Sequence, residues 1–192
     1  MNQLSFLKVT VFAALALLGA GLAKSSAQDS SGVIYSNDFA VNPLTPDGFT
    51  ATDPQAIVWT QDAIHDGKGS LKLTNTDKTK IVSAIGAFVP FTGGALHVSV
   101  EAKTDGIVGG AQPWEKASVQ IYYFDQNKTA IDYKWKNYSD TLPFAEGTQD
   151  WQTYDKAFFI PTSTQVAFIQ IRFNLLRSTG TAWIDKIRIA SQ

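Results

Sequence analysis

Residues 166–174 have the sequence Val-Ala-Phe-Ile-Gln-Ile-Arg-Phe-Asn, in which apolar and polar side chains largely alternate. A two-residue period is typical of a β-strand that buries one face. One face of this strand would hold Ala167, Ile169, Ile171 and Phe173. The other would hold Phe168, Gln170, Arg172 and Asn174. We therefore expect the first set in a hydrophobic core and the second on the opposite face of the sheet.

Other segments show the same alternation of apolar and polar residues. Alternation is clear in residues 95–103, 118–124 and 182–189. Shorter or less regular strand candidates are residues 33–36, 57–60, 70–74, 81–89, 131–138 and 151–160. Turn-forming residues separate these segments, and a helical period is sustained nowhere after the N-terminal region. The sequence thus predicts an all-β protein, a two-sheet antiparallel β-sandwich with jelly-roll topology.

Composition narrows the class of protein further. The chain has 192 residues, of which 44% are hydrophobic, with 16 Lys and Arg against 17 Asp and Glu. This size and composition fit one ordinary domain. A net charge of -1 gives no reason to expect nucleic acid as a partner. The lack of cysteine excludes disulfides, thiolate zinc sites and a cysteine nucleophile.

The N-terminal region differs from the rest. Lys8 precedes an apolar stretch, residues 9–23, and the small residues Ser25 and Ala27 follow it. This is the pattern of a secretory signal peptide cleaved after Ala27, because the apolar stretch is shorter than the roughly 20 residues that a spanning helix needs. We expect a signal peptide over residues 1–27 and a folded domain over residues 28–192, secreted or periplasmic and without membrane attachment after cleavage. An uncleaved anchor is the alternative.

The polar face of residues 166–174 has counterparts in two other segments. Alternation puts Gln120 and Tyr122 on the polar side of residues 118–124, and Glu101 on that of residues 95–103. Amide, guanidinium and carboxylate groups can hydrogen-bond pairs of sugar hydroxyls, and aromatic rings can stack on the C–H face of a pyranose. The pattern suits a glycan-binding face, and it equally suits the solvated outer face of an ordinary antiparallel sheet.

Four phrases carry a resemblance to a known family. They are Tyr35-Ser36-Asn37-Asp38-Phe39, residues 65–72 (HDGKGSLK), residues 150–154 (DWQTY) followed by Ile160-Pro161, and residues 180–189 (GTAWIDKIRI). In this order the sequence resembles the jelly-roll carbohydrate-binding modules, of galactose-binding-like type, that accompany secreted xylanases and glucanases. The resemblance implies a convex and a concave sheet, with the glycan cleft on the concave one.

The resemblance also suggests roles for individual residues. It implies that Arg172 contacts sugar and that Tyr133 and Trp135 supply stacking rings. Together with alternation it gives the expected carbohydrate-binding set of Glu101, Gln120, Tyr122, Tyr133, Trp135, Gln170, Arg172 and Asn174. Trp151 and Trp183 occupy phrases whose family role is core packing, so we expect them in the core.

A structural calcium ion is a further implication of the resemblance. Asp185 matches one carboxylate ligand of the family, and Asp38 and Lys68 match residues that offer backbone carbonyls. Ala40 stands where the family has a second acid, and Asp38 could turn its own carboxylate inward instead. Calcium takes six to eight oxygen ligands. The expected site is therefore Asp38, Lys68 and Asp185.

Binding without catalysis is the function that we predict. The expected partner is a polysaccharide or oligosaccharide, bound by a monomer that is not an enzyme. A structural or adhesive sandwich without glycan specificity is one alternative, and a small glycan hydrolase or lyase is another. A hydrolase normally needs two facing carboxyl groups, and Glu101 is the one acid that alternation places on the polar face.

Overall fold

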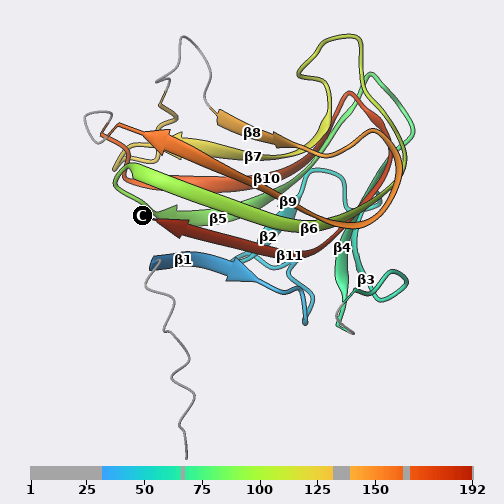
Figure 1. Cartoon of the computed structure of the whole chain (residues 1–192), viewed down its shortest axis with the longest axis horizontal. Helices are drawn as coiled ribbons and strands as arrows, with labels where there is room; N and C mark the ends of the chain where they lie inside the picture. Colours follow the sequence, from blue (N-terminus) through green and yellow to red (C-terminus); the bar gives the residue numbers. More distant parts are fainter. Residues whose placement is uncertain (1–31, 66–67, 132–138, 162–164, 192) are drawn as a thin grey trace, which may run out of the picture. The chain divides into compact units, whose positions relative to one another are not determined.

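The computed structural model describes residues 32–65, 68–131, 139–161 and 165–191. Within them the chain forms eleven β-strands, arranged in two antiparallel sheets (Figure 1). The described residues form no helix, so none that could cross a membrane occurs among them. The predicted jelly-roll β-sandwich is confirmed. The predicted signal peptide, residues 1–27, lies outside the described residues.

The strands divide between a six-stranded and a five-stranded sheet. The six-stranded sheet has the order β3-β4-β11-β6-β9, and β1 also pairs with β11. Its strands are β1 Gly32–Asn37, β3 Ile57–Thr60, β4 Ser70–Asn75, β6 Gly94–Val108, β9 Gly147–Ile160 and β11 Thr179–Ser191. The five-stranded sheet has the order β2-β5-β10-β7-β8. Its strands are β2 Phe49–Ala51, β5 Ile81–Pro90, β7 Ala117–Phe124, β8 Ser139–Pro143 and β10 Phe168–Leu176.

Strand β10 lies in the middle of the five-stranded sheet and confirms the expected alternation. Ile169, Ile171 and Phe173 are at most 1% exposed and belong to the core between the sheets. Strand β11 supplies the matching apolar side chains from the six-stranded sheet, including Ile184 and Ile187. Burial of each large apolar side chain is worth about 1.5–3 kcal/mol, so the central strands of both sheets are held by the core. Their polar side chains are left facing outward.

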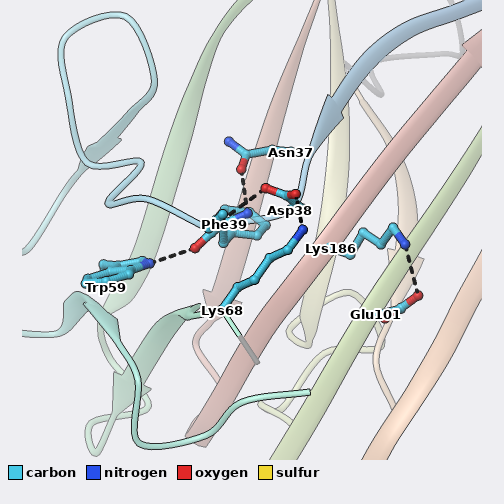
Figure 2. Close-up of polar contacts among 8 residues, drawn as sticks. Asn37, Asp38, Phe39, Trp59, Lys68, Glu101 and Lys186 are labelled. Atoms are coloured by element: carbon cyan, nitrogen blue, oxygen red, sulfur yellow. Dashed lines mark hydrogen bonds and ion pairs between the residues drawn. The ribbon is translucent and has the colours of Figure 1, made fainter. Parts of the chain in front are cut away.

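A tight turn after β1 fixes the edge of the sandwich. Phe39 has a φ of 48°, a left-handed conformation that costs a non-glycine residue free energy. The turn is held because the Asn37 Oδ1 accepts the Phe39 N–H at 2.8 Å and the Phe39 carbonyl accepts the Trp59 indole N–H at 2.9 Å (Figure 2). The Phe39 ring is fully buried. A Cβ on Gly69 would come within 2.7 Å of the Trp59 indole, so only glycine fits there without a shift.

Some sequence predictions about strands and core were incomplete or wrong. Strands β2 and β8 were not predicted, because both are short edge strands without clear alternation. Most of the strand expected at residues 131–138 lies outside the described residues. Trp151 and Trp183 are not in the core. Trp183 stands on the outer face between buried Ala182 and Ile184, and the Trp151 ring stacks on His65 at 5.3 Å.

Candidate functional site

A chain of hydrogen-bonded side chains crosses the outer face of the five-stranded sheet. The Ser83 hydroxyl on β5 donates to the Asn174 Oδ1 on β10 at 2.5 Å. The Asn174 Nδ2 donates to the Gln120 Oε1 on β7 at 3.0 Å. The Tyr122 hydroxyl donates to the same Gln120 oxygen at 3.0 Å. We call Ser83, Asn174, Gln120 and Tyr122 the polar ladder.

Arg172 lies against the polar ladder. Its guanidinium is 3.9 Å from the centre of the Tyr122 ring. Its Nε and Nη2 donate to the Gln170 Oε1 at 3.0 and 2.8 Å. A ring and an amide hold the guanidinium, and both are neutral, so its positive charge is oriented without being neutralised.

The residues at the base of this site are more deeply buried than those at its surface. Asn174 is 4% exposed, and Gln120 and Gln170 are each 8% exposed. Tyr122 and Arg172 are half-buried. Buried amides that bond to one another are fixed in position, because leaving one unsatisfied costs about 1–3 kcal/mol. Tyr122 and Arg172 are thus supported from below and remain reachable from solvent.

The structure brings five of the predicted residues together. Gln120, Tyr122, Gln170, Arg172 and Asn174 share the outer face of β7 and β10, as the alternation indicated. Tyr133 and Trp135 lie outside the described residues.

The prediction that Glu101 shares this face was wrong. Glu101 is on β6, in the six-stranded sheet, opposite Thr153 and Lys186. Its carboxylate lies 3.5 Å from the His65 Nε2 and 4.0 Å from the Lys186 Nζ, and Figure 2 shows the Lys186 contact. Alternation identifies residues on one face of a strand, but it does not say to which sheet that strand belongs.

An aromatic cluster continues the same face beyond the polar ladder. The Phe88 ring lies 4.9 Å from that of Phe124 and 6.1 Å from that of Phe168, both edge-on. The Lys128 ammonium lies 4.9 Å from the centre of the Phe88 ring and 5.9 Å from that of Phe168. Sequence reasoning missed Phe88 and Lys128. The shift of register that brings Phe88 opposite Gln170 has no clear sequence signal, and Lys128 lies in a turn.

A hollow of about 410 Å³ opens beside this cluster. It is lined by Pro46, Asp47, Gly48, Thr50, Ile85, Gly86, Ala87, Phe88, Lys128 and Gln170. Gln170 thus belongs both to the hollow and to the contact with Arg172. The face offers aromatic rings, amides and cations side by side, which is the chemistry that can hold a ring with hydroxyl substituents.

Two of the residues expected to ligate calcium, Asp38 and Lys68, pair with each other, and the calcium ion itself stays a prediction. The Lys68 ammonium forms an ion pair with the Asp38 Oδ2, so a positive charge already occupies that carboxylate (Figure 2). Lys68 lowers the pKa of Asp38, through its hydrogen bond above all, and the Ala40 N–H adds to this. Asp185 is buried at 1% exposure. The described residues contain no group of three His, Cys, Asp or Glu side chains that could hold a metal ion.

Comparison with solved structures identifies the fold. The CBM22-1 xylan-binding domain of Paenibacillus barcinonensis Xyn10C superposes with a TM-score of 0.51 at 18% identity, over 83% of this chain and 94% of that one. The fold is that of carbohydrate-binding modules. The CBM22-1–GH10 modules of Clostridium thermocellum xylanase 10B, complexed with xylohexaose, give a TM-score of 0.54 at 16% identity, over 84% of this chain.

The similarity extends to a larger protein of another kind. The enzymatically active domain of bacteriophage CBA120 tailspike protein 4 gives a TM-score of 0.52 at 15% identity, over 73% of this chain. The chain spans only 18% of that structure and 29% of the xylanase 10B structure. No protein-family model and no curated protein matches the sequence.

Proposed function

We propose that the outer face of the five-stranded sheet binds a polysaccharide or oligosaccharide without altering it. The observation that carries this proposal is the Arg172 guanidinium, which lies over the Tyr122 ring and is held by the Gln170 amide. The site is built before any ligand arrives, so little side-chain entropy is lost on binding.

Hydrogen bonding and aromatic stacking would both contribute to glycan binding. The described contacts do not use the Arg172 Nη1 or the Gln170 Nε2, so both can donate to sugar hydroxyls. The exposed parts of Tyr122 and the Phe88 cluster offer apolar surface to the C–H faces of a sugar. Hydrogen bonds from a charged donor are worth about 1.5–3 kcal/mol, so Arg172 is expected to contribute most.

The structural neighbours support a first choice of ligand. One neighbour is described as a xylan-binding domain, and another was solved with xylohexaose. These chains share less than a fifth of their residues with this one, so the ligand comes to this protein as a proposal. Xylohexaose is the first oligosaccharide to test.

Catalysis is not supported by the arrangement of acids. A glycoside hydrolase normally needs two carboxyl groups about 5–9.5 Å apart across the sugar. Glu101 lies on the other sheet, and Asp47 is the one carboxylate among the described residues that line the hollow. We therefore propose binding alone, by a monomer that residues 1–27 direct to the periplasm or the exterior.

Affinity measurements on the full chain and two variants test the proposal. Arg172→Ala is expected to weaken binding of xylohexaose, or of whichever oligosaccharide a glycan array selects, by about tenfold or more. Arg188→Ala, on the six-stranded sheet, is the matched control and should leave affinity unchanged. Undiminished binding by Arg172→Ala would show that this face is not the site. Release of reducing sugar or unsaturated uronate would overturn the non-catalytic proposal.

A further inference from the structure

Some cations on the outer faces of the sandwich lie beside carboxylates, and others lie over aromatic rings. On the six-stranded sheet, Lys103 lies 3.3 Å from Asp150, and Lys186 lies 4.0 Å from Glu101. On the five-stranded sheet, the Arg172 guanidinium contacts the Tyr122 ring and the Gln170 amide. The Lys128 ammonium lies over the Phe88 ring of the aromatic cluster. Among the described residues, neither of these two cations has a carboxylate partner. The five-stranded sheet thus presents oriented positive charge without a counter-ion.

The turn around Lys128 explains why its charge stays uncompensated. The nearest acid along the chain, Asp125, uses its Oδ1 to accept the backbone N–H groups of Asn127 and Thr129, each at 2.8 Å. Lys128 itself has a φ of 60°, and its backbone N–H donates to the Asp125 carbonyl at 3.0 Å. In this turn the Asp125 carboxylate therefore faces the backbone, and the Lys128 ammonium lies over the rings of Phe88 and Phe168.

The hollow beside Lys128 has the size and lining for one substituted sugar. Phe88 and Gln170 line it together with Lys128, and Asp47 is the acid on its lining. An aromatic ring can take a sugar face, the Gln170 amide can donate to a hydroxyl, and an ammonium can pair with an anionic group. The anion would sit near Lys128 and away from Asp47, which would repel it.

We propose that this hollow binds an anionic sugar, one that carries a carboxylate or a sulfate ester, and that Lys128 is the residue that selects it. This inference rests on the proposed function, since it names the kind of glycan that the same face takes. A cation held over aromatic rings is already oriented, so pairing with an anion costs little further ordering.

Three polymers that share a xylan backbone and differ in their charged substituents test the inference with the full chain. They are glucuronoxylan, the same glucuronoxylan with its carboxyl groups reduced to alcohols, and sulfated xylan. The unmodified protein should bind one or both anionic polymers about five- to tenfold more tightly than the reduced polymer, and the difference should shrink at high salt. Lys128→Met should remove the difference in affinity between the anionic polymers and the reduced polymer. Lys72→Met is the matched control, because Lys72 also lies over a ring, Trp183, but on the other sheet.

The outcomes separate this inference from the function on which it rests. A preference for an anionic polymer that depends on Lys128 supports the inference. Which of the two polymers is preferred, glucuronoxylan or sulfated xylan, shows whether the site takes a carboxylate or a sulfate. Equal binding of all three polymers overturns it and leaves glycan binding intact. A preference that survives in Lys128→Met also overturns it, because the selecting cation then lies elsewhere. Binding to none of them, nor to any neutral oligosaccharide, overturns both.

Discussion

The Arg172 guanidinium lies 3.9 Å from the centre of the Tyr122 ring, although the two residues are not directly paired. Tyr122 is opposite Gln170, and Arg172 is opposite Gln120, so the contact runs along the diagonal between β10 and β7. Diagonal neighbours on one face are within reach of long and aromatic side chains. The contact keeps the guanidinium over the face of the sheet and makes Tyr122 a positioning residue for Arg172.

Two substitutions of Tyr122 separate its ring from its hydroxyl. Tyr122→Phe keeps the ring beneath Arg172 and removes the hydrogen bond to Gln120, so affinity should stay within about threefold while stability falls by about 0.5–1.5 kcal/mol. Tyr122→Leu removes the ring as well, and affinity should fall by about tenfold. Calorimetric titration and urea unfolding measure the two effects. Unchanged affinity in Tyr122→Leu would show that the ring does not position Arg172.

Asn174 is expected to matter for stability more than Arg172. Asn174→Ala removes both its acceptor for the Ser83 hydroxyl and its donor to Gln120, in a place where Asn174 is 4% exposed. The loss should be about 1–3 kcal/mol in the free energy of unfolding, because buried polar groups lose their partners. Arg172→Ala, at a half-buried position, should cost less than about 1 kcal/mol. A loss in Arg172→Ala equal to that in Asn174→Ala would contradict this division of roles.

Periodicity was sufficient for the facing of β7 and β10 and for all of the described strands except the short edge strands β2 and β8. Gln120, Tyr122, Gln170, Arg172 and Asn174 were placed on one face correctly, because strand geometry allows only two sides. Glu101 was misplaced, because membership of a sheet depends on pairing between distant strands. Local sequence does not encode that pairing.

Residues whose positions depend on three-dimensional packing were also not predicted correctly. Phe88 reaches the binding face through an irregularity in the pairing of β5 with β10, and Lys128 reaches it from a turn. Trp151 and Trp183 were predicted in the core because they occupy phrases whose role in the resembling family is core packing. They lie instead on the outer face, where His65 and Lys72 lie against their rings.

Acid should destabilise the loop that Glu115 holds. The Gln112 backbone N–H, which donates to the Glu115 Oε2 at 3.0 Å, lowers the pKa of Glu115 below its ordinary 4.5, and Arg177 lowers it further, against the opposing effect of burial. The unfolded chain then binds the proton first as pH falls, so this contribution to stability is complete above about pH 4.5 and is lost as pH falls through the folded pKa. Glu115→Gln lacks this dependence.

Urea unfolding of both proteins across pH 3–7 checks the sign. The unmodified protein should be the more stable at pH 7, and its advantage over Glu115→Gln should shrink below about pH 4.5. An advantage that is constant with pH, or one that grows in acid, would show that the Glu115 carboxylate is not stabilised in its charged form.

Calcium dependence tests the one ion that the sequence led us to expect. The Lys68 ammonium pairs with the Asp38 carboxylate, so a dication near Asp38 would have to displace a positive charge and be repelled by it. EDTA and millimolar calcium should therefore both leave the melting temperature of the full chain unchanged. Lys68→Met should lower stability by at most about 1 kcal/mol, because the pair is largely exposed. A fall of several degrees with EDTA would contradict this expectation and would mean that Asp185 and the neighbouring carbonyls hold calcium despite Lys68. Repeating the EDTA comparison on Asp185→Asn would then show whether that carboxylate is the ligand, since the shift should disappear in the variant.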